Sequence, residues 1–326
     1  MLELIYPLAA VLLGFVVLVW SADRFIDGAA ATANYAGLPP LLIGMVIVGF
    51  GTSAPEMVVS AMAAWDGNPE LAVGNGLGSN IVNIALVLGL TALLVPLSVH
   101  SNIIKKELPI LIGLGLLVGW FFYDGRLTRL ESWCLLGGFF ALIGWTIWVA
   151  LNGKGDGIED DIEQELAEKS MTLGMAIFWL LLGLLLLLAS SRLLVWGSVE
   201  IAEFFAVPDL VIGLTIVALG TSLPELAASI VAARKGEHDI AIGNVVGSNM
   251  FNLLAVIGIA GVIHPVDALT AEVLTRDWLV MMALIVALLV MAYGFGRQGR
   301  ITRVEGGILL VCYFAYNIWL GFSVWG

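Results

Sequence analysis

Charged residues are scarce in this chain, and their scarcity excludes most soluble folds. Only 12% of its 326 residues are Asp, Glu, Lys or Arg, whereas soluble globular domains carry about 25%. Hydrophobic residues make up 60%. Apolar stretches of about 20 residues, the length that a helix needs to cross a bilayer, recur along the whole sequence. We therefore expect an integral membrane protein embedded in the lipid bilayer.

Cysteine and histidine are also rare. The two cysteines, Cys134 and Cys312, lie far apart in apolar runs, which excludes a disulfide framework or a zinc motif and predicts a packing role. The three histidines fall near expected helix ends. No HExxH or GxSxG motif occurs, so a hydrolase has no candidate constellation. We expect no enzyme activity and no cofactor.

The formal charge of −12 arises largely from one segment. Seven acidic residues lie between Asp156 and Glu168. Such a run is typical of a solvated linker, and nucleic-acid binding is not expected. The N-terminal apolar run lacks the basic start and the cleavage site of a secretory signal, so we interpret it as a retained first helix.

A duplication organises the chain. Self-similarity over whole halves indicates two copies of one structural unit. An offset of 169 residues relates the two halves as far as Pro265, and an offset of 174 relates the segments that follow. The matching pairs are GTSAPE (51–56) with GTSLPE (220–225), GNGLGSNIVN (74–83) with GNVVGSNMFN (243–252), and GRLTRLE (125–131) with GRITRVE (299–305).

Each copy contains five apolar spans, and an odd number makes the second copy enter the membrane from the opposite side. The predicted fold is an all-α integral membrane protein with ten transmembrane helices in two inverted-topology five-helix repeats. Residues 1–150 form the first repeat, 151–170 an acidic cytoplasmic loop and 171–326 the second repeat. The spans are 5–33, 40–64, 70–95, 105–123, 130–150, 172–199, 209–232, 239–263, 277–295 and 304–323.

Loop charges predict the orientation. Loops after odd-numbered spans hold nine Lys or Arg residues, and the other loops hold three. The positive-inside rule then places both termini outside the cytoplasm, in a multi-pass protein of the cell's inner (plasma) membrane. The nine are Lys105, Lys106, Lys154, Lys169, Arg234, Lys235, Arg297, Arg300 and Arg303, and the three are Arg126, Arg129 and Arg276.

Two glutamates, Glu56 and Glu225, lie near the middle of apolar spans. An ionised carboxylate there costs at least about 2.5 kcal/mol, and no Lys or Arg lies close in sequence to neutralise either one. Protonation or a bound cation relieves that cost. The glutamates are therefore candidate ion ligands.

Prolines next to the glutamates predict exposed backbone oxygens. Pro55 and Pro224 cannot donate the hydrogen bonds that the carbonyls of Gly51 and Gly220 would otherwise accept. Freed carbonyls at membrane depth are tolerated where they line a protein cavity, and hard cations such as Na⁺ and Ca²⁺ prefer oxygen ligands.

Hydroxyl and amide side chains surround the same positions. Within the partner spans, each Ser-Asn pair is separated by four residues and so shares a helix face. Ser, Thr and Asn in membrane helices often do no more than form hydrogen bonds between helices. For a single serine, this purely structural role is the preferred interpretation. The same pattern occurring twice at equal spacing favours an ion site. The residues are Thr52, Ser53, Thr221, Ser222, Ser79, Asn83, Ser248 and Asn252.

The two motifs resemble the α-repeats of the sodium/calcium exchanger family, within the calcium/cation antiporter superfamily, in a short prokaryotic-type form. The resemblance covers essentially the whole chain. It implies that Glu56 and Glu225 coordinate Ca²⁺ together with the carbonyls of Thr52 and Thr221. It also implies overlapping Na⁺ sites that use Ser53, Ser79, Ser222, Ser248 and the carbonyls of Gly49 and Ala218. Asn83 and Asn252 correspond to the family's central pair, and many members carry aspartate at the position of Asn252.

The expected function is Na⁺/Ca²⁺ antiport by alternating access, with Ca²⁺ leaving, Na⁺ entering and helices 1 and 6 sliding past the other eight. H⁺/Ca²⁺ antiport, or antiport of another divalent cation, by the same fold is an alternative because buried glutamates take up protons. A passive cation channel is a second alternative. No obligatory protein partner is evident.

Overall fold

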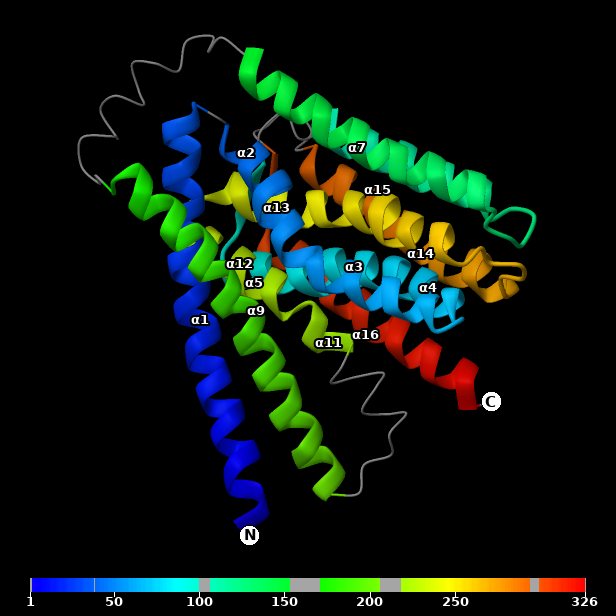
Figure 1. Cartoon of the computed structure of the whole chain (residues 1–326), viewed down its shortest axis with the longest axis horizontal. Helices are drawn as coiled ribbons and strands as arrows, with labels where there is room; N and C mark the ends of the chain where they lie inside the picture. Colours follow the sequence, from blue (N-terminus) through cyan, green and yellow to red (C-terminus); the bar gives the residue numbers. More distant parts are fainter. Residues whose placement is uncertain are drawn as a thin grey trace.

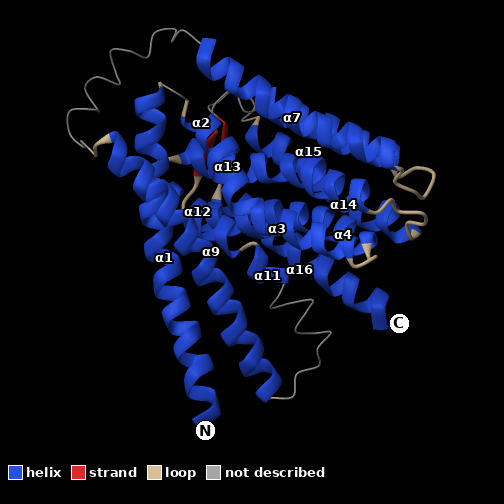
Figure 2. Ribbon diagram, viewed as in Figure 1, coloured by secondary structure: helices blue, strands red, loops and turns tan. Residues whose placement is uncertain are grey.

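The computed structural model describes residues 2–37, 39–99, 106–152, 171–205, 218–293 and 299–325, and nearly all of them are helical (Figure 2). Two short strands, β1 (Leu97–Val99) and β2 (Gly299–Ile301), pair antiparallel. The acidic loop predicted at 151–170 lies outside the described residues from position 153 onwards.

The helices lie close to the predicted spans. Short π-helical segments, named η, occur within or beside several predicted spans in the described part of the chain, and regular hydrophobic periodicity did not predict them. In the first half the elements are α1 (Leu2–Ala36), α2 (Pro40–Leu42), η1 (Ile43–Val48), α3 (Gly49–Trp65), α4 (Pro69–Ile81), η2 (Val82–Leu88), α5 (Gly89–Leu94), α6 (Leu108–Phe121) and α7 (Arg129–Asn152).

The second half follows the same order. Residues 206–217, which include the first part of the predicted span 209–232, lie outside the described residues. The elements are α9 (Leu173–Phe204), α11 (Ala218–Thr221), α12 (Leu223–Arg234), α13 (His238–Phe251), η5 (Asn252–Val256), α14 (Ile257–Ile263), η6 (Val273–Trp278), α15 (Leu279–Ala292) and α16 (Arg303–Trp325).

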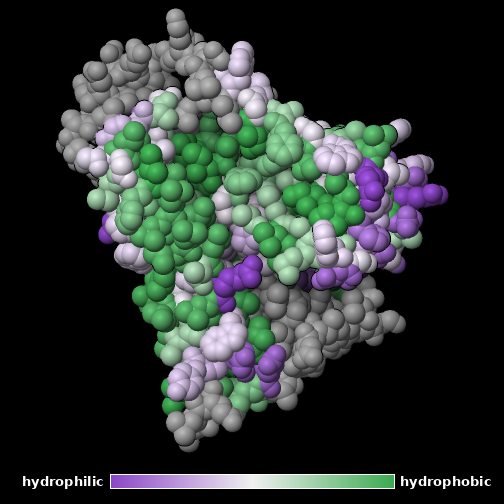
Figure 3. Space-filling model, viewed as in Figure 1, coloured by the Kyte–Doolittle hydropathy of each residue, from purple (hydrophilic) through white to green (hydrophobic). Residues whose placement is uncertain are grey.

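Seven helical stretches in the described part of the chain are long and apolar enough to cross a membrane. Large apolar side chains cover the outside, including Trp120 (77% exposed) and Phe322 (74%), and a hydrophobic surface extends over α1 and α9 (Figure 3). The chain is therefore a multi-pass membrane protein. Cys134 of α7 and Cys312 of α16 are exposed, so any packing role that they have is at the protein surface, since apolar runs in a membrane protein also face lipid.

The centre of the molecule consists of the stretches 69–94 and 238–263. Their apolar windows are 72% and 83% buried, whereas the window in α16 is only 11% buried. The buried hydrophobic core includes residues of both stretches and continues into the helices around them. This burial requires the polar side chains that the central helices carry to find partners inside the protein.

Helices α1 and α9 form a closely packed pair, steeply inclined to α3, α4, α7 and α14 (Figure 1). Glycines permit the close approach, because a Cβ added at Gly183 would lie 2.8 Å from the Phe25 backbone. A Cβ at Gly14 would lie 3.0 Å from the Leu194 backbone. Small residues at such interfaces let helix backbones touch.

Contacts in one half recur in the other with the partners exchanged. Gly14 faces Leu194, and the positions 169 residues away, Gly183 and Phe25, face each other. The strands behave in the same way. Leu97 pairs with Ile301, and the corresponding residues, Val266 and Leu127, form an isolated bridge.

The close approach of α1 and α9 predicts the effect of adding one methyl group. Gly183→Ala places a Cβ against the Phe25 backbone and should destabilise the protein by about 1–3 kcal/mol, because overpacked cores relax poorly. Thermal unfolding of the purified protein, followed by tryptophan fluorescence, measures the loss.

The matched control lies on the same helix. Gly174 has no neighbouring atom within 4 Å of an added Cβ, so Gly174→Ala should leave the midpoint unchanged or slightly higher, since alanine favours helix. Equal midpoints for the two variants would contradict the packing argument.

Candidate cation-binding site

The two predicted glutamates lie on separate helices and are almost completely buried. Glu56 of α3 is 2% exposed, and Glu225, in the first turn of α12, is 1% exposed. Neither forms an ion pair with a basic side chain among the described residues. The positive charge of Arg192 in α9 attracts the Glu56 carboxylate, whereas the like charge of Glu225 repels the Glu56 carboxylate. The site therefore holds two carboxylates that lack a paired protein cation.

Hydroxyl groups connect the two halves around these acids. Ser53, three residues before Glu56, donates a long hydrogen bond to Glu225 Oε1 (3.4 Å). Thr52 Oγ1 lies within hydrogen-bond distance of Asn244 Oδ1 (3.2 Å), and Ser248 Oγ donates to the Gly49 carbonyl (3.4 Å). Residues that the sequence places about 170 to 200 positions apart thus meet at one point.

Several buried oxygen atoms at this point have no hydrogen-bond partner within the described part of the chain. Unpartnered buried polar atoms are uncommon in proteins and require an explanation. Five of these oxygens belong to predicted ligands, and oxygen is the ligand atom that hard cations prefer. The five are Glu56 Oε2, Glu225 Oε2, Asn83 Oδ1, Asn252 Oδ1 and Ser222 Oγ. A sixth, Asn249 Oδ1, belongs to the same motif but was not a predicted ligand.

The two prolines have different effects on their helices. Helix α3 continues through Pro55, whereas the second half breaks at Ser222 (φ −91°, ψ 3°), and α12 begins just before Pro224. The freed carbonyl of Gly220 accepts a hydrogen bond from Ser191 Oγ of α9 (2.9 Å). The prolines were predicted to free the Gly51 and Gly220 carbonyls, and the structure adds that a side chain of another helix binds the second of these.

The position equivalent to Ser191 in the first half is Ala22, which lacks a hydroxyl group. Ala22 is fully buried, so the difference lies inside the protein. The hydrogen bond from α9 to the GTSLPE turn therefore has no side-chain counterpart from Ala22 to the GTSAPE turn.

Two asparagines that were not predicted from the sequence hydrogen-bond to the backbone carbonyls of the two glutamates. Asn244 Nδ2 donates to the Glu225 carbonyl (3.2 Å) and to Ser229 Oγ (2.9 Å). Asn75 Nδ2 does the same for the Glu56 carbonyl (3.4 Å) and Ser60 Oγ (2.9 Å). Both asparagines follow the first glycine of the GNxxGSNxxN motif, so the duplication itself was the signal that identifies them.

The central asparagines lie in π-helical segments, which are frequent at functional sites. Asn83 belongs to η2, and Asn252 begins η5. Asn252 Nδ2 donates to Asn80 Oδ1 (3.1 Å), and Asn80 Nδ2 donates to the Asn249 carbonyl (3.2 Å). These bonds hold the Asn252 nitrogen, which leaves its oxygen available to a ligand.

The remaining predicted ligands lie on the same elements. Gly49 begins α3, Ala218 and Thr221 begin and end α11, and Ser79 is a buried residue of α4. Among the described residues, no group of three or more His, Cys, Asp or Glu side chains is suited to hold a metal ion. Two acids and neutral oxygens make up the candidate site.

A family model described as "Sodium/calcium exchanger protein" matches residues 6–148 and 175–322. The chain belongs to this family. The family consists of exchangers rather than enzymes, so the chain is a membrane transporter of the cation-antiporter class.

Proteins from several organisms resemble the chain along its length. "Putative antiporter CaxA" of Alkalimonas amylolytica is 50% identical, covering 94% of this chain and 96% of that protein. "Inner membrane protein YrbG" of Escherichia coli is 37% identical, covering 97% and 96%. A solved structure of the sodium-calcium exchanger NCX_Mj has a TM-score of 0.81 and 27% identity, covering 96% of this chain and 98% of that one.

The hydrogen bonds of Asn244 predict that this residue positions Glu225 in the exchanger. Asn244→Ala removes the bonds to Glu225, Ser229 and Thr52 and should weaken cation binding about 10- to 100-fold, as loss of groups that orient metal ligands does. Isothermal titration of the purified protein with Ca²⁺ measures the affinity.

Asn317→Ala provides the control, because Asn317 of α16 donates to the Tyr313 carbonyl of its own helix. Its Ca²⁺ affinity should equal that of the unmodified protein. If Asn244→Ala binds Ca²⁺ within twofold of this control, the positioning role is refuted.

Proposed function

We propose that this family member is a Na⁺/Ca²⁺ antiporter of the inner membrane, which exports Ca²⁺ in exchange for Na⁺ by alternating access. The observation that carries the proposal is the set of unpartnered buried oxygens around Glu56 and Glu225. Such oxygens in low dielectric favour a hard cation over an empty cavity.

Ca²⁺ is coordinated by Glu56, Glu225 and the carbonyls of Thr52 and Thr221 in this proposal. Na⁺ occupies overlapping sites formed by Ser53, Ser79, Ser222, Ser248, Asn83, Asn252 and the carbonyls of Gly49 and Ala218. The cross-half hydrogen bonds of Ser53, Thr52 and Ser248 support one shared cavity. An amide at Asn252, where many family members have aspartate, leaves two acids, which balance one Ca²⁺ or two Na⁺.

Charge balance supports obligatory exchange. Carrying two uncompensated carboxylates through the membrane interior costs several kcal/mol at least. The empty protein therefore changes its orientation slowly, and one ion leaves only when another replaces it.

The transport architecture consists of ten transmembrane helices in two inverted five-helix repeats, 1–150 and 171–326, joined by a cytoplasmic loop at 151–170, with both termini outside. The exchanged contacts between halves support it: Gly14 with Leu194 and Gly183 with Phe25. Inverted repeats provide two pseudo-symmetric states that expose a midplane site to each side in turn. The close α1–α9 pair is suited to move as one body past the other helices.

H⁺/Ca²⁺ antiport is the second candidate, favoured by the burial of both glutamates. A carboxylate without a paired cation in an apolar interior binds protons readily. In that case protons, rather than Na⁺, replace Ca²⁺ at Glu56 and Glu225.

Ion flux distinguishes these candidates. Proteoliposomes loaded with Na⁺ and diluted into Na⁺-free medium should accumulate ⁴⁵Ca²⁺, and they should not do so when only a pH gradient is imposed. Uptake that follows the pH gradient alone would reject sodium coupling. Uptake that needs no counter-ion would favour a channel.

Neutralising either acid should stop exchange. Glu56→Gln and Glu225→Gln are expected to reduce Na⁺-driven ⁴⁵Ca²⁺ uptake at least 100-fold, because the remaining single charge no longer balances Ca²⁺. Glu70→Gln, at an exposed residue in the first turn of α4, should transport normally. Coupled uptake near the normal rate in either buried variant would refute the assignment of the site.

A further inference from the structure

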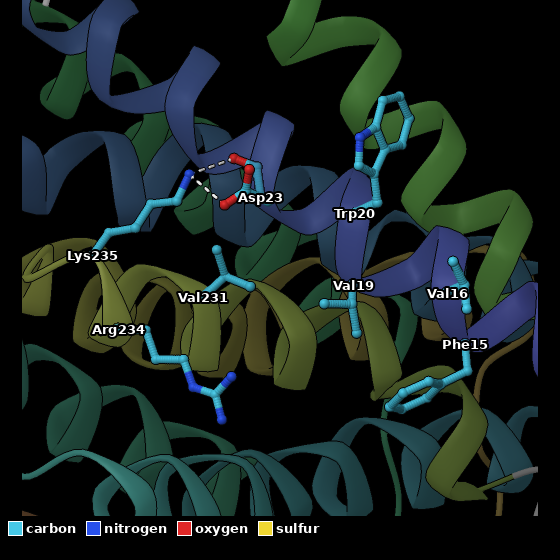
Figure 4. A pocket seen from close by; sticks show the side chains of 8 residues that line it. All are labelled: Phe15, Val16, Val19, Trp20, Asp23, Val231, Arg234 and Lys235. Carbon is cyan, nitrogen blue, oxygen red and sulfur yellow. Dashed lines mark hydrogen bonds and ion pairs between the residues drawn. The ribbon is translucent and has the colours of Figure 1, made fainter.

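An open groove of about 530 Å³, whose lining includes neither glutamate, lies between α1 and the end of α12 (Figure 4). Pockets that hold small molecules have volumes of about 300–1,000 Å³. Helix α1 provides one wall, and Val231, Arg234 and Lys235 provide the other. The residues of α1 are Phe15, Val16, Val19, Trp20 and Asp23.

The groove has charged groups at one end only (Figure 4). Lys235 Nζ lies 2.7 Å from Asp23 Oδ1 and 2.7 Å from Asp27 Oδ1. Asp23 and Asp27 are 45% and 36% exposed. Arg234 also lines the groove, on the other side of Val231 from the Lys235–Asp23 pair (Figure 4). The groove therefore presents both a partly exposed carboxylate and a guanidinium group.

The other end of the groove is apolar and open to the outside. Phe15, Val16, Val19 and Trp20 are 59%, 64%, 44% and 44% exposed. From Asp23 to Phe15 the helix rises about 12 Å, at about 1.5 Å per residue. That distance approaches half of the hydrocarbon core, which is about 30 Å thick. Arg234 ends α12 and Lys235 follows it, on the side predicted to carry most of the basic residues, where membrane proteins contact lipid headgroups.

We propose that this groove binds a phospholipid whose headgroup carries both a phosphate and a primary ammonium, of the phosphatidylethanolamine class. The phosphate lies on Arg234, the ammonium donates to Asp23, and an acyl chain runs along Val231, Val19 and Phe15. Arginine is well suited to bind phosphate oxygens.

Charge distinguishes this lipid from the other common classes. An anionic headgroup without an ammonium would satisfy Arg234 but leave Asp23 facing a phosphate. A choline headgroup carries a positive charge but has no N–H group to donate to a carboxylate. The lipid would contact α1, which packs on α9, and α12, which carries Glu225, at the same time.

Native mass spectrometry of the purified, delipidated protein tests the proposal without measuring transport, so it stands or fails separately from the proposed function. The probes are dioleoyl phosphatidylethanolamine, phosphatidylcholine and phosphatidylglycerol, added one at a time at equal concentration. One ethanolamine lipid should remain bound per protein at about fivefold lower concentration than the other two.

Three variants locate the site. Arg234→Ala removes the phosphate partner, and Val19→Trp fills the groove; each should weaken retention of the ethanolamine lipid at least fivefold. Asp23→Asn should reduce it to the level of the choline lipid. The controls are Arg129→Ala and Val286→Trp, at an exposed arginine of α7 and an exposed valine of α15, and both should retain the lipid normally.

Each other result overturns the proposal. Equal retention of the three lipids would indicate nonspecific annular lipid, and preference for phosphatidylglycerol would indicate an anionic-lipid site. Normal retention by both Arg234→Ala and Val19→Trp would place the lipid elsewhere. A variant that loses its compact gel-filtration peak is set aside, and the other two decide.

Discussion

Two carboxylates enclosed in an apolar protein within a membrane impose the constraint on which the rest of this structure depends. Glu56 and Glu225 are nearly inaccessible and carry no paired protein cation among the described residues. Every ionised acid in such a place needs a counter-charge or a proton. Among the described residues, neutral oxygen atoms surround the pair and Arg192 attracts only Glu56, an arrangement that agrees with the cation site proposed above.

Holding these acids in place requires polar side chains on buried helices that are otherwise apolar. Asn75 and Asn244 do this with amides that bond the backbone of each glutamate and a serine one turn further along. The surrounding helices can approach because glycines face neighbouring backbones, as Gly49 does opposite Ser248. Close packing and buried hydrogen bonds thus support each other, since a loose interior would admit water to the acids.

The sequence alone predicted the helices, the duplication and the two acids, because each has a strong physical signature: length of apolar runs, repeated motifs and rare intramembrane charge. It did not predict the π-helical segments at Asn83 and Asn252, which arise from register shifts that hydrophobic periodicity does not encode. It predicted freed carbonyls before Pro55 and Pro224 but not how each helix responds. The helix breaks only at the second, where Ser191 of another helix binds the freed Gly220 carbonyl.

The hydroxyl group of Ser191 has no equivalent at Ala22. The two halves of this molecule therefore differ in energy. A buried hydrogen bond contributes about 0.5–1.5 kcal/mol, which changes a two-state ratio by roughly two- to twelvefold. If α9 moves relative to α11, one orientation gains that bond and the other loses it. The Ser191 oxygen alone would then bias the resting protein toward the orientation that faces one side of the membrane, before any ion gradient acts.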